Sequence, residues 1–338
     1  MTTRIDMKTF LIWLLGVALF FVVLIFGTYF GMRREDIPYA ALEKAYSNAT
    51  SKFVDLPSGV RAHYRIDGKQ DGRTLVLIHG YGVSLESWTA WISELRSDFR
   101  LVSVDLPGHG LTRSPADYAP WNSGFVDFID EFTGVMGLTR FVIVGNGSGG
   151  NAAWRFALRR PERLEAMVLI SPFGWPHGDK SNPLVVELFS NPKIQPLLIE
   201  IDPSGMVQNG LNSAYENKAL VTDRMISRYS EMARAPGHRR ILGTLMLERD
   251  RSLSATGEKL ATIKAPTLIL WGNKDALAPV GDAKRFSDAI SGSKMIVYDG
   301  IGHMVHEETP AKSATDLKAF LAEHSTGGDP TAASKVAR

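Results

Sequence analysis

The stretch VIVGNGSGGNAAW, residues 142–154, sets glycine and small polar residues between an apolar run and a helix-forming run. Strand, tight turn and helix in this order occur in two unrelated kinds of site. Gly145, Gly147 and Gly150 satisfy the G-x-G-x-x-G pattern with which dinucleotide-binding domains hold a pyrophosphate. The same stretch nearly satisfies G-x-S-x-G, the sharp turn that presents a catalytic serine. The rest of the chain discriminates between these two interpretations.

Short apolar runs alternate with helix-length segments on both sides of this stretch. Two strands are expected within 52–67, and further strands at 74–80, 100–108, 140–145, 164–172, 266–272 and 294–300. Apolar strands that alternate with helices are typical of a parallel sheet covered by helices on both faces. We therefore predict an α/β fold with a mainly parallel sheet of about eight strands.

The strand rhythm stops between residues 173 and 254. Three stretches there are expected to be helices with no strand between them: 184–189, 196–201 and 219–235. We interpret 173–254 as a helical cap inserted into one core that comprises 51–172 and 255–324. The cap is placed over the carboxyl edge of the strands, where ligands bind in open α/β sheets.

The first thirty residues predict a membrane anchor. Residues 10–30 carry no charged side chain, and a helix of this length spans the roughly 30 Å of a bilayer core. The run is longer than the apolar part of a usual signal peptide, and no A-x-A-like cleavage site follows it. Two basic residues flank it on each side, so the positive-inside rule favours neither orientation.

Composition limits the remaining possibilities. The 338 residues include 38 Lys and Arg against 36 Asp and Glu, and no basic run indicates a nucleic-acid partner. The chain has no cysteine, which excludes disulfides, thiolate catalysis and cysteine-ligated metals. Residues 31–50 are interpreted as a polar linker, and the small, polar residues 325–338 as a disordered tail.

The dinucleotide interpretation lacks its acidic partner. Such a site needs a carboxylate about 20 residues further on, at the end of the next strand, to bind the ribose. That strand ends at Ile170-Ser171-Pro172, and Glu165 stands at its opposite end. A dinucleotide fold also usually carries its glycines after the first strand, whereas here about the fifth strand precedes them. The sequence therefore favours the nucleophile turn.

Four further motifs follow the ends of predicted strands in a fixed order. They are HGYG at 79–82, DLPGHG at 105–110, WGNKDALAP at 271–279 and GIGHMVHEETP at 300–310. With the turn at 145–150, their order resembles that of the α/β-hydrolase superfamily over about residues 52–324. The N-terminal anchor, with HGYGVSLESW and VDLPGHG, is similar to the membrane-anchored esterases and monoacylglycerol lipases.

The resemblance implies an acyl-transfer site. His303 is then the base that takes the proton of the nucleophile, and Asp275 holds its imidazole in the right tautomer. Backbone amides in two stretches, Gly80-Tyr81 and Ser148-Gly149, would stabilise the oxyanion. His79, His109 and His306 are interpreted as structural. The resemblance implies no metal and no organic cofactor.

The position of the nucleophile raises a difficulty. Laid on the family's pattern, the nucleophile falls on Gly147 rather than Ser148. Taking Ser148 instead would put Asn146 where a closely packed glycine belongs and leave one residue too many after the strand. The turn holds its central residue at positive φ, which glycine adopts without penalty. We favour Gly147 at the turn and keep Ser148 as the alternative.

These observations predict a membrane-anchored carboxylester hydrolase that acts on apolar acyl esters or lipids through an acyl-enzyme. With Gly147 at the turn, this chain would be an inactivated form. Three alternatives stay open. They are a ligand-binding homologue without catalysis, a hydrolase of carbon–carbon bonds, and a cofactor-free enzyme that uses only His303 and Asp275.

Overall fold

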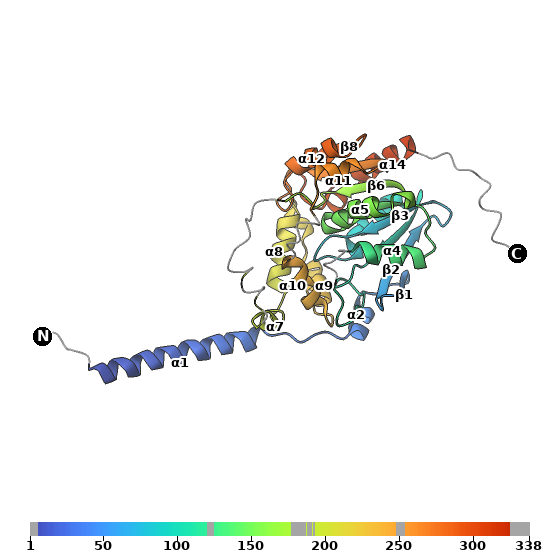
Figure 1. Cartoon of the computed structure of the whole chain (residues 1–338). Coiled ribbons are helices and arrows are strands. Elements are labelled where there is room, and N and C mark those ends of the chain that lie inside the picture. Colours follow the sequence, from blue (N-terminus) through green and yellow to red (C-terminus); the bar gives the residue numbers. More distant parts are fainter. Residues whose placement is uncertain are drawn as a thin grey trace.

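An eight-stranded sheet forms the centre of the molecule (Figure 1). The computed structural model describes residues 6–119, 125–176, 187, 191, 193–247 and 254–324. The strands are β1 Ser51–Asp55, β2 Arg61–Gly68, β3 Arg73–Ile78, β4 Phe99–Val104, β5 Phe141–Asn146, β6 Leu164–Ile170, β7 Thr267–Gly272 and β8 Lys294–Tyr298. Their order in the sheet is β1-β2-β4-β3-β5-β6-β7-β8. The pairs β1–β2 and β2–β4 are antiparallel and the other pairs are parallel, which confirms the predicted fold class.

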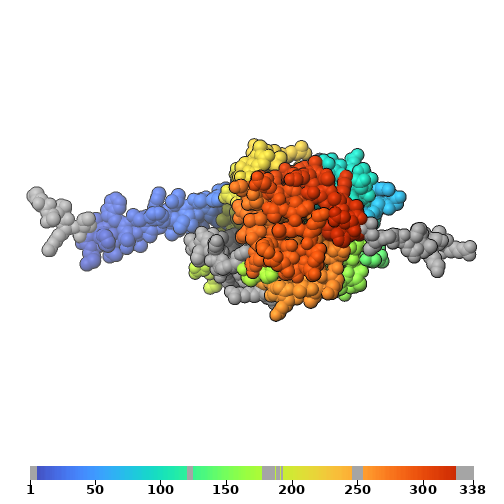
Figure 2. Space-filling view, turned by 90° about the horizontal axis from the view of Figure 1, so that it is seen from above, coloured from blue at the N-terminus to red at the C-terminus, as the bar shows by residue number. Residues whose placement is uncertain are grey.

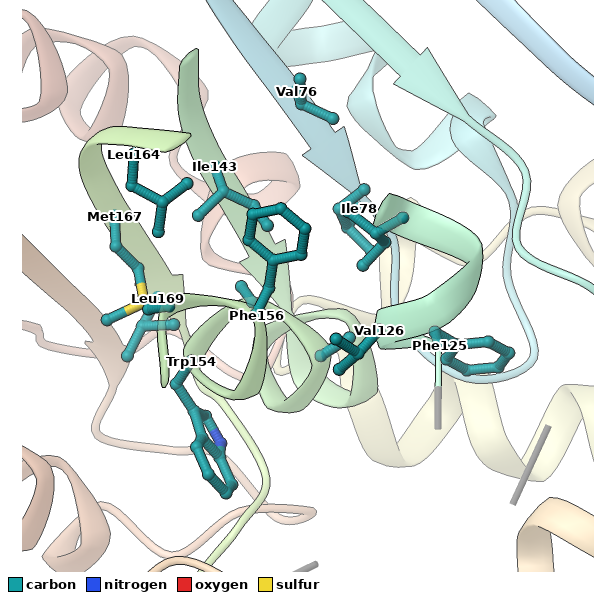
Figure 3. Close-up of a cluster of buried hydrophobic side chains, with 14 of the residues drawn as sticks. Val76, Ile78, Phe125, Val126, Ile143, Trp154, Phe156, Leu164, Met167 and Leu169 are labelled. Carbon is teal, nitrogen blue, oxygen red and sulfur yellow. The ribbon is translucent and has the colours of Figure 1, made fainter. Parts of the chain in front are cut away.

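Helices cover both faces of the sheet. The central strands carry apolar side chains on both faces, because successive side chains point to opposite faces and both faces are buried. In β3, Val76 and Ile78 belong to the cluster on one face, and Leu75 and Leu77 to the cluster on the other. Figure 3 shows the first cluster, with Phe156 pointing from its helix toward the strands.

The first face packs against α4 (Val126–Val135), α5 (Gly147–Arg159), α11 (Gly257–Ala261) and α12 (Gly281–Ala289). The second face packs against α3 (Thr89–Leu95), α13 (Val305–Glu308) and α14 (Pro310–Glu323). Two short 3₁₀ segments, η1 (Leu85–Trp88) and η2 (Pro161–Arg163), precede α3 and β6.

The described part of the predicted cap is helical. It contains α7 (Gln195–Leu198), α8 (Ser204–Ala214), η3 (Lys218–Leu220), α9 (Asp223–Ala233) and α10 (His238–Leu247), of which α8, α9 and α10 are grouped together in Figure 1.

Two helices of the cap differ in the structure from those that the sequence predicts. The helix predicted over 219–235 is divided, because Thr222 caps the start of α9 by accepting the Met225 N–H. The helix predicted over 196–201 ends at Leu198, since Ile201 pairs with Arg33. The helix predicted over 184–189 lies outside the described residues apart from Glu187.

The N-terminal apolar run forms α1, Met7–Met32, with no buried residue. Its most apolar 18-residue window has a mean hydropathy of 2.9, and within the described part of the chain it is the one helix long and apolar enough to cross a membrane. In the segment expected as a linker, Tyr39–Tyr46 form α2, whose Leu42 is buried. The predicted tail, 325–338, lies outside the described residues.

The glycines of the turn let α5 approach the sheet. A Cβ built on Gly149 would meet the carbonyl oxygens of Ile78 and His79, closer than side-chain carbons approach backbone atoms. We expect Gly149→Ala to lower the free energy of unfolding by about 2–4 kcal/mol, because backbone of β3 or α5 must move. Urea unfolding followed by circular dichroism measures this.

Gly134 provides the matched control for this substitution. It lies in α4, and a Cβ on it would meet nothing within 4 Å. Gly134→Ala should leave stability unchanged or raise it by about 0.4–1 kcal/mol. Equal effects of the two substitutions would contradict the close approach at Gly149.

Candidate active site

Four of the predicted motifs meet at the carboxyl edge of the sheet. His79 follows β3, Gly147 follows β5, Asp275 follows β7 and His303 follows β8. These four strands are parallel, so their carboxyl ends lie at the same edge. Residues more than 200 positions apart are thereby brought into one site.

His303 and Asp275 form a buried pair. Nδ1 of His303 lies 2.8 Å from Oδ2 of Asp275, and the two side chains are 5% and 0% exposed. The other carboxylate oxygen of Asp275 accepts the N–H groups of Leu277 and Ala278, each at 2.8 Å. Both oxygens are therefore engaged, and the carboxylate is fixed against the imidazole.

The other ring nitrogen of His303 faces Gly147. Gly147 has φ +53° and begins α5, so it is the central residue of the turn. A Cβ built on Gly147 would lie 2.8 Å from His303 Nε2 and 3.5 Å from Cε2 of Phe173. A side chain at residue 147 would thus point at the nitrogen that takes a proton in acyl transfer.

Ser148 is oriented differently. Its hydroxyl is buried and has no hydrogen-bond partner among the described residues. It is the second residue of α5, and the first four N–H groups of a helix have no partner within that helix. The backbone amides of Ser148 and Gly149 therefore have no acceptor inside α5.

The second stretch predicted to supply oxyanion amides borders the turn. A Cβ on Gly80 would lie 2.9 Å from Oδ1 of Asn146, the last residue of β5. Tyr81 follows Gly80, and its hydroxyl donates to the carbonyl of Leu242 in α10 at 3.0 Å. Gly80 and Tyr81 thus lie between the turn and the cap.

The remaining histidines named in the sequence analysis are buried. Nδ1 of His79 donates to the Gly80 carbonyl at 2.8 Å, and Nε2 accepts the Leu106 N–H at 2.9 Å. Burial lowers the pKa of His79 and lowers that of His109 further. Burial, with His303 nearby, lowers the pKa of His306 to about 3. All three rings are neutral at pH 7.

The sequence reasoning did not find two residues that touch His303. The side-chain amide of Asn146 donates to the carbonyls of Ile170 and His303, each at 3.2 Å. The ring of Phe173 stacks on the His303 imidazole with centroids 5.3 Å apart. Asn146 stands at a variable position of the turn motif and Phe173 in none of the motifs, and both contacts depend on how distant segments pack.

The cap is hydrogen-bonded to the loop that carries His303. The His303 N–H donates to the Ala214 carbonyl at 2.7 Å. One carboxylate, that of Glu308, accepts the N–H of Gly302 at 2.9 Å and those of Glu216 and Asn217 at 2.9 and 2.8 Å. The backbone of the base is therefore held by the end of α8 as well as by the core.

Glu307, beside this carboxylate, gives the fold a pH dependence. Its side chain is 14% exposed and accepts the Tyr215 hydroxyl at 2.8 Å, and burial raises the pKa of Glu307 to about 8. The folded protein thus retains a proton that the unfolded chain releases near pH 4.3. The proton bound by Glu307 contributes to the free energy of unfolding. This contribution is complete below about pH 4.3 and is lost as pH rises toward 8.

We expect Glu307→Gln to reduce the fall in unfolding free energy between pH 5 and pH 8 by a few kcal/mol. An amide cannot ionise, so the contribution no longer changes with pH. Urea unfolding at each pH measures the slope. Glu323→Gln, on an exposed side chain paired with Lys294, is the control and should leave the slope unchanged. Parallel slopes for parent and Glu307→Gln would refute the assignment.

Known proteins resemble this chain in sequence and in fold. The profile of the alpha/beta hydrolase fold family matches residues 73–310. A monoacylglycerol lipase of Mus musculus is 30% identical over 75% of this chain and 77% of its own length. The structure of a membrane phospholipase A covers 94% of this chain and 99% of its own, with a TM-score of 0.69 and 22% identity. A meta-cleavage product hydrolase of Pseudomonas fluorescens has a TM-score of 0.69 and 25% identity, over 81% of this chain and 98% of its own.

Proposed function

The chain belongs to the α/β-hydrolase fold family, and from this premise we propose that its site is that of a carboxylester hydrolase whose nucleophile position holds Gly147. The observation that carries the proposal is the direction of the buried His303–Asp275 pair. Nε2 of His303 faces the Cβ position of residue 147, whereas the Ser148 hydroxyl has no partner among the described residues.

Each residue then has a chemical role. His303 acts as the base, Asp275 fixes its tautomer, and the amides at Tyr81 and Ser148, flanked by Gly80 and Gly149, stabilise the oxyanion. Without a hydroxyl at residue 147 no acyl-enzyme forms. The bound ester is then attacked only by water, whose proton passes to His303 Nε2, and the rate is low.

We propose apolar acyl esters, including lipids, as the substrate class. The monoacylglycerol lipase among the relatives acts on such an ester by its name, and the membrane phospholipase A has the same fold. An apolar N-terminal helix keeps the protein near such substrates.

A fluorophosphonate probe tests the assignment of the nucleophile. Covalent capture needs an activated hydroxyl beside His303, so we expect the unmodified chain to remain unlabelled. Hydrolysis of p-nitrophenyl esters by the same preparation should be slow, and that of a His303→Ala variant slower still, because the variant lacks the base that takes the proton of water. Stoichiometric labelling at Ser148 would show instead that Ser148 is the nucleophile.

Two other functions have an observation in their favour. Gly147 itself favours a homologue that binds apolar ligands without turnover, and retention of an intact ester by the purified protein would distinguish it. The likeness to the meta-cleavage product hydrolase favours carbon–carbon bond hydrolysis. A panel of esters and ring-cleavage products separates this activity from ester hydrolysis.

We further propose that α1 is retained as a membrane anchor. The full-length chain should sediment with membranes and need detergent for release, because a span of this length inserts in an effectively irreversible way. A chain that begins at Glu35 should be soluble and keep the circular dichroism spectrum of the core. Recovery of the full-length chain in the soluble fraction without detergent would contradict the anchor.

A further inference from the structure

The chain that leaves α1 is bound to the cap rather than free. The Arg34 N–H donates to the Glu200 carbonyl and the Asp202 N–H to the Met32 carbonyl, each at 2.8 Å. Arg33 and Ile201 form an antiparallel bridge between them. The last residues of α1 and the residues after α7 therefore form a short two-stranded contact.

Side chains reinforce this contact. The Glu200 carboxylate accepts the Tyr29 hydroxyl at 2.8 Å and lies 2.7 Å from Nε of Arg33. The Asp202 carboxylate lies 3.1 Å from Nε of Arg34. Both arginines are thus paired with carboxylates of the cap, so their charges are compensated without lipid phosphate.

The next residues are bound to a second part of the cap, around the start of α10. Arg239 donates to the Arg34 carbonyl at 2.8 Å and lies 2.6 Å from the Asp36 carboxylate. The Ile37 N–H donates to the Arg234 carbonyl at 2.8 Å. Residues 32–37 are therefore attached to the cap at several points, which fixes the direction in which α1 leaves it.

This attachment brings exposed apolar side chains of the cap to the end of α1. Leu197 in α7 is 51% exposed and Met206 in α8 is 54% exposed, and they flank the bound residues 200–202. In both views α1 projects from the side of the molecule on which the cap helices lie (Figures 1 and 2). A helix of 26 residues exceeds the roughly 20 needed to span a bilayer core, so its last turn reaches the headgroup level.

We propose that the α7–α8 face of the cap, marked by Leu197 and Met206, lies on the surface of the bilayer that holds α1. The partner is a lipid surface, contacted through apolar side chains, since the nearby arginines are already paired. This inference rests on the proposed anchor. It adds that the cap, which contacts the His303 loop through Ala214, is held against the membrane from which an apolar ester comes.

The absence of cysteine from the chain makes a direct test possible. Leu197→Cys, Met206→Cys and Val135→Cys are each labelled with an environment-sensitive fluorophore in the full chain. Val135 ends α4 and is 46% exposed, which matches the other two positions. The proteins are reconstituted in phosphatidylcholine vesicles that contain spin-labelled phosphatidylcholine. We expect several-fold stronger quenching and a blue-shifted emission at 197 and 206 relative to 135.

A second variant tests the attachment itself. Glu200→Ala with Asp202→Ala removes the side-chain contacts to Tyr29, Arg33 and Arg34, and should lower quenching at 197 while α1 stays in the membrane. Equal quenching at 197, 206 and 135 in vesicle-bound protein would overturn the inference, as would quenching at 197 that the double variant leaves unchanged. Failure of the full chain to associate with vesicles would instead refute the anchor.

Discussion

Gly147→Ser is expected to raise the rate of ester hydrolysis by about 10⁴-fold or more, because it supplies the hydroxyl that the His303–Asp275 pair faces. The backbone at residue 147 already has the positive φ of the turn, +53°. A serine there costs about 1–2 kcal/mol of strain. Its Cβ, 2.8 Å from the present position of Nε2, requires the His303 ring to withdraw slightly from the turn.

The measurement is the hydrolysis of p-nitrophenyl esters of increasing acyl length, together with fluorophosphonate labelling of the same preparations. Only the Gly147→Ser chain should be labelled, at residue 147. Ser148→Ala is the matched control and should change little in either background, because the proposal uses only the backbone amide of Ser148. If Ser148→Ala removed an activity already present in the unmodified chain, the register of the turn would be wrong.

The second large effect is expected at Asp275. In the Gly147→Ser background, Asp275→Asn should lower kcat by about 10⁴-fold, because an amide nitrogen opposite Nδ1 favours the wrong tautomer of His303. The substitution can leave the fold intact, since the remaining oxygen still accepts the N–H groups of Leu277 and Ala278. The kcat and KM of the two variants, measured with one ester, give the comparison.

Asp288→Asn is the control for this experiment. Asp288 lies in α12, paired on the surface with Lys284, and its loss should leave kcat within about twofold, as surface ion pairs contribute little. A fall in kcat after Asp275→Asn with KM and the circular dichroism spectrum unchanged supports a role in the reaction. Full activity of the Asp275→Asn chain would show that the pair does not take part in it.

Local sequence patterns predicted much of the fold of this protein and part of its candidate site. The alternation of apolar strands with helices gives the mainly parallel sheet, because burial on both faces imposes the same apolar composition on each central strand. The uncharged run at 10–30 predicts α1, because a long apolar segment without charges favours helix. Asp275 and His303 were predicted as partners because each follows a strand in a recognisable motif, and the structure brings the two side chains within 2.8 Å at the same edge of the sheet.

The tertiary structure decided what depends on contacts between distant segments. The sequence left residues 147 and 148 as alternatives for the turn, and the structure places His303 Nε2 opposite residue 147. Asn146 binds the His303 carbonyl, and Glu308 binds the N–H groups of Glu216 and Asn217, through hydrogen bonds that leave no pattern in the sequence. The attachment of residues 32–37 to the cap is of the same kind. Such contacts join residues 91 to 205 positions apart in the chain, and no local spacing or periodicity encodes them.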